Sequence, residues 1–312
     1  MPESLPWNSY SSFFEKKYGY RIWRVGVDAG FSCPNRNAQR QGGCIYCDAL
    51  GAAAAYQRSF DGSSVRFQSI KDQIERGRSF MKRRYNAGHF ALYFQAFSNT
   101  FAPVDRLREI YDAGLEGNTW DALIVSTRPD CIDESKTALL KSYMDRGLEV
   151  CVELGLQSGS DEILRAMNRG HDVSCFLKAS ELITRAGLEL SVHTLLGFPG
   201  EGERELALTA DAVNKSGARF VKLHNLNIVE GTVLYEKYLK GEARAPELQE
   251  YVVKACFLLR RLRPDIVIER LVCDTPDGRL VSPGDFPDKT TFIKILSQYM
   301  DSKGFRQGDL SV

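Results

Sequence analysis

The stretch 149-EVCVELGLQ-157 alternates apolar and polar side chains, as a β-strand does when its two faces meet different surroundings. One face carries four branched apolar residues: Val150, Val152, Leu154 and Leu156. The other face carries a largely polar set: Glu149, Cys151, Glu153, Gly155 and Gln157. A face that holds Glu153 and Gln157 does not suit a dry barrel core, so this strand predicts a polar, ligand-binding lumen.

Six strand-like runs of this kind alternate with amphipathic helical stretches along the chain. The runs cover residues 22–30, 90–98, 120–128, 148–158, 188–200 and 219–229. Helical periods fill the intervals at 69–85, 104–117, 134–147, 173–187 and 204–217. Strand and helix repeated six times predict a parallel barrel or an open α/β sheet. Polar residues share strand faces elsewhere too, with Ser126 beside Arg128 and Lys222 beside His224.

The pattern changes after residue 230, where a helical run, a strand near 265–272 and a last helix near 289–300 follow. We expect a barrel domain over residues 1–230 and a C-terminal α/β extension over 231–312 that packs on the barrel. With 312 residues and 43% hydrophobic content, the chain is long enough to bury a large core.

Charge and hydropathy exclude several classes of protein. Lysine and arginine number 41 against 40 acidic residues, so no overall field attracts nucleic acid, and any RNA contact must be a local patch. No apolar stretch reaches the roughly 18 residues of a membrane span, and the first thirty residues lack the apolar core of a signal peptide. We therefore expect a cytoplasmic protein without membrane contact.

Three cysteines, Cys33, Cys44 and Cys47, form the motif C-x10-C-x2-C, and no fourth lies nearby. Their thiolates could bind zinc or an iron–sulfur cluster. A structural zinc normally takes four protein ligands, and the next candidates, His89 and Cys131, belong to later elements. Three thiolates on a 4Fe-4S cluster leave one iron open, which favours the cluster if that iron must bind a substrate or cofactor.

These cysteines and several other stretches resemble the radical S-adenosylmethionine (SAM) superfamily, in particular its YhcC/YtqA-like branch. The stretches are the cysteine loop, 93-YFQAFSNTFAP-103, 126-STRPDCI-132, 153-ELGLQSGSDEILRAMNRGH-171, 193-HTLLGFPGE-201, 222-KLHNLNIVEGT-232 and the late Gln307–Gly308 pair. The resemblance implies a partial (β/α)6 TIM-like barrel, a 4Fe-4S cluster and SAM. It also implies reductive cleavage of SAM to a 5'-deoxyadenosyl radical, with a flavodoxin or ferredoxin as the electron donor.

The resemblance implies roles for residues that would hold SAM. Arg169 would grip the methionine carboxylate, and the acceptors for the ribose hydroxyls would be Glu153, Gln157 and Ser158. Relatives often carry an acid at the position of Ser126, so this sequence departs from the pattern there. The strand end that meets the methionine amine lacks paired glycines and offers Gln95, Ser98 and Asn99. Adenine would lie between Tyr46 and the turn at Gly197.

On the substrate side, the residues expected to face the lumen are His193, Lys222 and His224. Cys131, after the third strand, could donate hydrogen or simply pack. The middle of the chain also resembles the catalytic subunit of elongator, which modifies tRNA wobble uridines, so tRNA is the expected partner. Alternatives are radical chemistry on a protein or metabolite, and a zinc-stabilised nucleic-acid-binding module without catalysis. The RNA contacts would come from two basic clusters: Lys82, Arg83 and Arg84 before Tyr85, and Arg260, Arg261 and Arg263.

Overall fold

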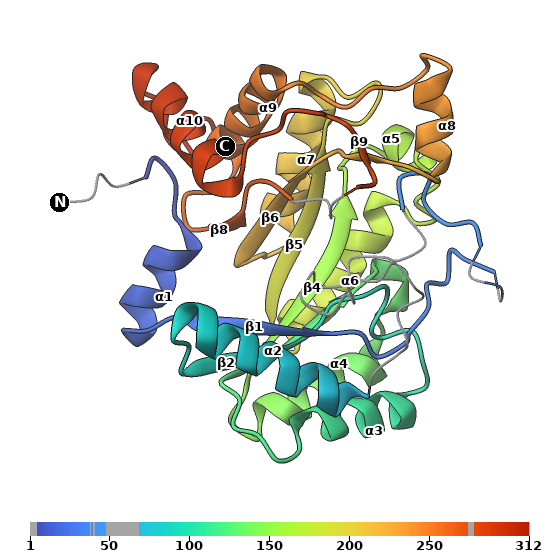
Figure 1. Cartoon of the computed structure of the whole chain (residues 1–312), viewed down its shortest axis with the longest axis vertical. Helices are drawn as coiled ribbons and strands as arrows, with labels where there is room; N and C mark the ends of the chain where they lie inside the picture. The colour runs from blue at the N-terminus through green and yellow to red at the C-terminus, as the bar shows by residue number, and fades with distance from the viewer. Residues whose placement is uncertain (1–4, 38, 40, 48–68, 274–277, 312) are drawn as a thin grey trace.

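A curved sheet of parallel strands forms the centre of the computed structural model, which describes residues 5–37, 39, 41–47, 69–273 and 278–311 (Figure 1). Within these residues the sheet has seven strands in the order β1-β2-β3-β4-β5-β6-β8. The strands are β1 Ile22–Val27, β2 His89–Phe94, β3 Ala122–Thr127, β4 Glu149–Gln157, β5 Glu189–Leu196, β6 Phe220–Asn225 and β8 Val267–Arg270. This arrangement confirms the α/β class and the partial barrel.

Most of the helices cover the outer face of the sheet, whereas the first helix lies at the amino ends of the strands. The first six are α1 Tyr10–Tyr18, α2 Ile70–Tyr85, α3 Val104–Leu115, α4 Glu134–Met144, α5 Asp161–Ala166 and α6 Val173–Arg185. Those that follow are α7 Glu203–Lys215, α8 Val233–Leu239, α9 Leu248–Arg261 and α10 Lys289–Ser302, and a short 3-10 turn η2 spans Pro129–Cys131. The apolar strand faces, Val152 among them, pack against these helices in one large core, as the alternation in β4 predicts.

Side-chain caps start several helices close to their predicted positions. The side chains of Ser69, Asp133 and Asp172 accept hydrogen bonds from the backbone N–H groups of the first turns of α2, α4 and α6. These caps satisfy donors that the helix cannot pair internally. The segments between the carboxyl ends of the strands and these helices lie at the edge of a parallel barrel that carries the functional loops.

The C-terminal extension contributes to the same sheet. Strand β8 pairs in parallel with β6, whereas β7 Ile228–Val229 and β9 Leu280–Ser282 form a separate antiparallel pair. Strand β8 therefore belongs to the barrel sheet although it lies beyond residue 230. The division of the chain into two domains at that residue stays a prediction.

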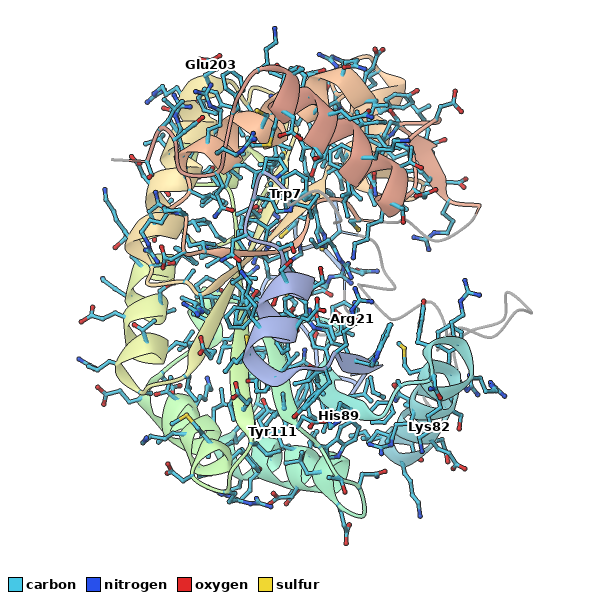
Figure 2. The ribbon with its side chains drawn as sticks, turned by 90° about the vertical axis from the view of Figure 1, so that its left-hand side faces the viewer. Trp7, Arg21, Lys82, His89, Tyr111 and Glu203 are labelled. Carbon is cyan, nitrogen blue, oxygen red and sulfur yellow. The ribbon has the colours of Figure 1, made fainter. Side chains whose placement is uncertain are left out.

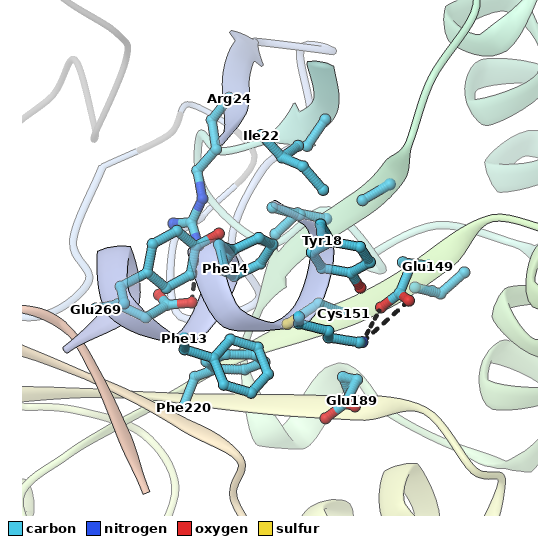
Figure 3. Close-up of a pocket in the computed structure, with 16 residues that line it drawn as sticks. Phe13, Phe14, Tyr18, Ile22, Arg24, Glu149, Cys151, Glu189, Phe220 and Glu269 are labelled. Carbon is cyan, nitrogen blue, oxygen red and sulfur yellow. Dashed lines mark hydrogen bonds and ion pairs between the residues drawn. The ribbon is translucent and has the colours of Figure 1, made fainter. Parts of the chain in front are cut away.

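The amino-terminal segment bridges the two outer strands. Ile268 of β8 donates a backbone hydrogen bond of 2.7 Å to the carbonyl of Asn8, and Arg24 of β1 forms an ion pair of 2.7 Å with Glu269 of β8. Helix α1 lies against the amino ends of the strands, where Phe14 and Tyr18 stand over Cys151 around a cavity of about 30 Å³ (Figure 3). Helix α1 thus covers the lumen at the amino ends of the strands.

Candidate active site

A layer of paired charges crosses the middle of the lumen. The Glu153 carboxylate accepts hydrogen bonds from Arg24 at 3.0 Å, from Tyr93 at 2.5 Å and from Lys222. The Glu269 carboxylate forms ion pairs with the Arg24 guanidinium at 2.7 Å and with the Lys222 ammonium group at 3.5 Å. Two carboxylates therefore face two cations, and this balance is what allows charges to remain in a buried layer.

The balance shows in the direction of the pKa shifts. Burial alone would raise the pKa of Glu153, but the Lys222 and Arg24 cations outweigh it and lower the pKa to about 2. Burial, followed by the field of Arg24, lowers the pKa of Lys222. The Glu153 carboxylate is thus held ionised at neutral pH, with both oxygens already engaged.

This layer changes the picture drawn from the sequence. Lys222 does face the lumen, but its ammonium group is paired with Glu153 and Glu269. The roles assigned to Glu153 in ribose binding and to Lys222 on the substrate side stay predictions. Sequence reasoning missed Arg24 and Glu269, although the alternation in 22-IWRVGV-27 and 267-VIER-270 places both residues on lumen faces.

Two histidines stand on the carboxyl-terminal side of the charged layer. The rings of His193 on β5 and His224 on β6 meet edge to face with centroids 4.0 Å apart. Burial, helped by the Lys222 cation, lowers the pKa of His193 to about 3, and burial likewise lowers that of His224. Neither Nε2 atom has a hydrogen-bond partner among the described residues. The pair therefore offers two neutral imidazoles to a ligand in the lumen.

The cysteine loop is fastened to its surroundings through backbone contacts. Ile45 donates to the carbonyl of Met167 at 3.1 Å and accepts from the N–H of Leu234 on α8 at 2.8 Å. The Asn168 amide donates to the Gly43 carbonyl at 2.7 Å, and the Asn35 amide to the Asn168 carbonyl at 2.6 Å. The loop thus lies over the carboxyl end of β4.

Cys44 and Cys47 lie together within this loop. A hydrogen bond from the Cys47 thiol, opposed by burial and reinforced by the Arg169 guanidinium, lowers the pKa of Cys44 to about 4. The Cys44 thiolate in turn raises the pKa of Cys47. Among the described residues no group of three or more His, Cys, Asp or Glu side chains is placed so that it could hold a metal ion.

Arg169 connects the loop to strand β4. Its Nη1 lies 3.7 Å from the Cys44 sulfur, its Nη2 donates to the Gly155 carbonyl at 2.8 Å, and its buried Nε has no partner. A Cβ on Gly155 would stand 2.7 Å from Arg169 Nη2 and equally close to the Gln157 amide, so a larger residue there would displace these two groups. A buried cation with an unused donor beside a thiolate suits an anionic ligand group.

Arg128 and His171 complete the polar surroundings. The sequence placed Arg128 on a polar strand face beside Ser126 but assigned no ligand to it, and it suggested no role for His171. Arg128 is 3% exposed, binds the Asp130 carboxylate through two hydrogen bonds of 2.8 Å and leaves Nη1 without a partner. His171 lies 3.2 Å from the Gly155 carbonyl through Nε2, and burial, with Arg169 next, lowers its pKa to about 4. Both residues sit in motifs that carried the resemblance, 126-STRPDCI-132 and the RGH at 169–171, which was the available signal.

The end of β4 carries an unusual backbone. Gln157 has a φ of 75° next to an irregular register with β5, and its Oε1 atom is buried without a partner. Such bulges re-aim side chains, and positive φ at a non-glycine residue concentrates at functional sites. Ser158 is fully buried, and its hydroxyl accepts from the N–H of Ser160 at 3.2 Å.

Asn99 is tied into the framework at the ends of β2 and β3. Its amide donates to the carbonyls of Phe94, Ala96 and Ser126 at 2.9 to 3.1 Å, so it fixes the loop geometry. The remaining predicted residues lie at the same edge. Ser126 and Gln95 are half-buried, and the Gln95 N–H donates to the Val27 carbonyl at 3.2 Å.

Cys131 is 2% exposed at the end of η2, beside the Ser98 hydroxyl. Burial raises the pKa of its thiol to about 12, so the thiol is neutral at physiological pH. A neutral thiol suits both of the roles left open, packing and hydrogen donation.

The predicted adenine slot brings its two halves together. The Tyr46 ring lies 5.5 Å from the Phe198 ring of the turn that follows β5. Gly197 has a φ of 100°, and Pro246 would stand 2.4 Å from any Cβ there, so glycine is required. The Gly197 N–H donates to Glu201 at 2.6 Å, and burial raises the pKa of Glu201 to about 7. This carboxyl holds the turn closed.

A parallel partial barrel with a three-cysteine loop over the carboxyl ends of its strands defines the class of radical SAM enzymes, and the chain belongs to it. The radical SAM superfamily model matches residues 33–213, and the radical SAM C-terminal domain model matches residues 218–302.

Among its relatives, Protein YhcC of Escherichia coli strain K12 is 31% identical over 298 residues, which cover 95% of this chain and 93% of the relative. A tRNA uridine(34) acetyltransferase of Methanocaldococcus infernus is 31% identical over 190 residues, 59% of this chain and 34% of the relative. The solved structure of the archaeal Elp3 of that organism, with an N-terminal deletion, has a TM-score of 0.62 at 18% identity and covers 92% of this chain and 64% of that one. This structural likeness shows the shared fold.

Enzymes of this superfamily use a 4Fe-4S cluster and SAM, which together supply the 5'-deoxyadenosyl radical. The donor set fits: the three thiols of Cys33, Cys44 and Cys47 would hold the cluster, and the unused donors of Arg169 and Arg128 lie beside them. The charged layer, the capping helix α1 and the bridged strands close the opposite end of the lumen. With the cluster and SAM bound, these cysteines and arginines would bind and orient the reactants.

Proposed function

We propose that this enzyme directs its radical at the C5 side chain of a tRNA wobble uridine. The observation that supports this substrate is the similarity over 190 residues to the tRNA uridine(34) acetyltransferase of Methanocaldococcus infernus. That similarity is in sequence and covers more than half of this chain, whereas the other relative described above carries no substrate in its name.

The lumen is chemically compatible with a nucleobase. His193 and His224 present neutral rings with free Nε2 atoms, which can hydrogen-bond to the carbonyl and N–H groups of an uncharged base. The charged layer beneath is internally balanced, so it does not demand a charged substrate. A flavodoxin or ferredoxin would deliver the electron.

No helix of the described residues is long and apolar enough to cross a membrane. A tRNA substrate would place the reaction in the cytoplasm.

The test compares modified tRNA nucleosides from cells with and without the gene. We expect one wobble-uridine derivative to disappear in the deletion strain and an earlier intermediate to accumulate. A plasmid copy of the parent gene should restore the derivative, while a Cys44→Ala copy should not. If every wobble uridine is unchanged in the deletion strain, the proposed substrate is wrong.

A further inference from the structure

Four aromatic rings and four cations gather around the amino end of β1 and the carboxyl end of α2, on one side of the molecule. We call this set the aromatic–basic face: Tyr20, Arg21, Trp23, Lys82, Arg83, Arg84, Tyr85 and His89. Figure 2 shows Arg21, Lys82 and His89 on this side. Apart from the half-buried Trp23 and His89, these residues are exposed.

The rings form two stacked pairs. Tyr20 and His89 stack with centroids 3.6 Å apart and planes 13° from parallel, and Trp23 and Tyr85 stack at 4.2 Å and 15°. Tyr20 is 38% exposed and Tyr85 is 45% exposed, so each pair keeps part of a ring open to solvent. Arg21 lies 5.8 Å from the Trp23 ring and Arg84 lies 5.8 Å from the Tyr85 ring. The rings are therefore held in place before any ligand arrives.

Within the part of the chain that the structure describes, the cations of this face have no acidic partners. None of the ion pairs in the described chain involves Arg21, Lys82, Arg83 or Arg84, and helix α2 carries six basic residues against two acidic ones. His89 pairs with Asp121 at 2.9 Å, which leaves the neighbouring cations unopposed.

The second predicted basic cluster is different, because internal contacts occupy it. Arg260 pairs with Asp309 at 2.8 Å and stacks 3.6 Å from the Phe305 ring, and Arg263 pairs with Asp265 at 3.0 Å. Arg261 lies 3.6 Å from the Phe257 ring. These side chains tie α9 to its neighbours, so of these two clusters the aromatic–basic face is the one whose cations lack acidic partners among the described residues.

We propose that the aromatic–basic face binds a single-stranded stretch of the RNA whose base enters the lumen, an inference that rests on the proposed function. Exposed rings beside cations that have no acidic partner among the described residues match the bases and phosphates of a single strand. Strand β1 runs from this face to the cysteine loop, and its six residues span about 20 Å. One RNA can therefore touch the face and the mouth of the lumen together.

The test measures binding of an unmodified tRNA transcript to the holoenzyme and its variants over a range of salt. We expect Arg83→Ala/Arg84→Ala to bind more weakly and to flatten the slope of log affinity against log salt by about 1.4, from about 0.7 for each lost single-strand phosphate contact. Tyr85→Ala should bind about tenfold more weakly through lost stacking, and Tyr85→Phe should bind like the parent.

The matched control is Lys294→Ala/Lys303→Ala, which removes two exposed cations on and just after α10 and should bind like the parent. All variants should retain uncoupled SAM cleavage, which shows that the barrel is intact. Equal binding by parent and face variants, or equal losses in face and control variants, would overturn the proposal. The two proposals are tested by different measurements. An unchanged nucleoside profile in the deletion strain would overturn the uridine substrate, whereas the RNA-binding measurements alone decide whether the aromatic–basic face binds RNA.

Discussion

Arg169 links the Cys44 thiol to the Gly155 carbonyl. Its own Nε donor is buried and has no partner among the described residues. Its methionine-carboxylate role comes from the resemblance, and its burial and open donor are what such a role needs. Arg169 is 7% exposed, so it is not a solvated surface arginine.

Arg169→Ala should weaken SAM binding about tenfold or more while the iron content stays the same. The physical reason is the loss of a charge-assisted pair, typically about 1.5 to 3 kcal/mol. Titration of SAM into the reduced protein measures it, and Arg165→Ala, an exposed arginine on α5, serves as the matched control. Unchanged SAM affinity in the Arg169 variant would refute the assignment.

His193 should make stability depend on pH. Its folded pKa of about 3 lies below the ordinary value of 6.5, so between these values the unfolded chain binds more protons than the fold does. Stability therefore falls as the pH drops through 6.5, by about 2 kcal/mol between pH 7 and pH 5. In urea unfolding of the metal-free protein, His193→Gln should lose less stability over this range, and parallel curves for variant and parent would contradict the prediction.

The strands show both the reach and the limit of sequence reasoning. Alternation in 149-EVCVELGLQ-157 predicted an apolar outer face and a polar lumen face, and Val152 and Glu153 lie accordingly. The pattern could not reveal which lumen charges pair, because Arg24 and Glu269 meet across 245 positions of sequence. The partners of Glu153 and Lys222 could therefore not be predicted, because they come from strands that meet only when the barrel forms.

The charged layer makes a prediction about these strands together. Lys222→Met should destabilise the fold by about 3 to 5 kcal/mol, because Glu153 and Glu269 would then share Arg24 alone. Adding Glu269→Leu restores one cation for one carboxylate, so the double variant should be more stable than the sum of the two single changes allows. Urea unfolding of all four proteins measures this, and strictly additive losses would argue against a coupled layer.

The two basic clusters were indistinguishable in sequence, since both are short runs at helix ends. The fold separates them. Arg260 and Arg263 meet acids supplied by Asp309 and Asp265, while Arg83 and Arg84 meet none among the described residues. The distinction comes from how α9 packs against the C-terminal segment, which sequence patterns do not reveal.

Gln307 joins the two ends of the chain. Its Oε1 accepts from the N–H of Asn8 at 2.9 Å, and its Nε2 donates to the carbonyls of Arg263 and Ile266, each at 2.8 Å. Its backbone N–H donates to the Pro6 carbonyl at 2.9 Å. In the sequence, Gln307 was noted only through the resemblance. In the structure, its hydrogen bonds hold the amino-terminal segment against the segment that leads into β8.

Gln307→Ala should therefore weaken the attachment of the amino-terminal segment to β8. Three side-chain hydrogen bonds disappear from a buried position, at a cost of about 3 kcal/mol. Hydrogen exchange should speed up at residues 7–9 and in β8, with little change in β3 and β4. If the exchange rates instead change equally in all strands of the sheet, Gln307 does not stabilise this region in particular.

The central claim is that three cysteines of one loop carry the cluster that makes this barrel a radical SAM enzyme. Its most direct test is the iron and sulfide content, with 5'-deoxyadenosine formed from SAM, of the anaerobically purified parent, Cys44→Ala and Cys256→Ala. Loss of a thiolate ligand should abolish cluster and product in Cys44→Ala, while the buried Cys256, packed in the core, should be replaceable with both retained. A full cluster and normal product in the Cys44→Ala protein would contradict the account.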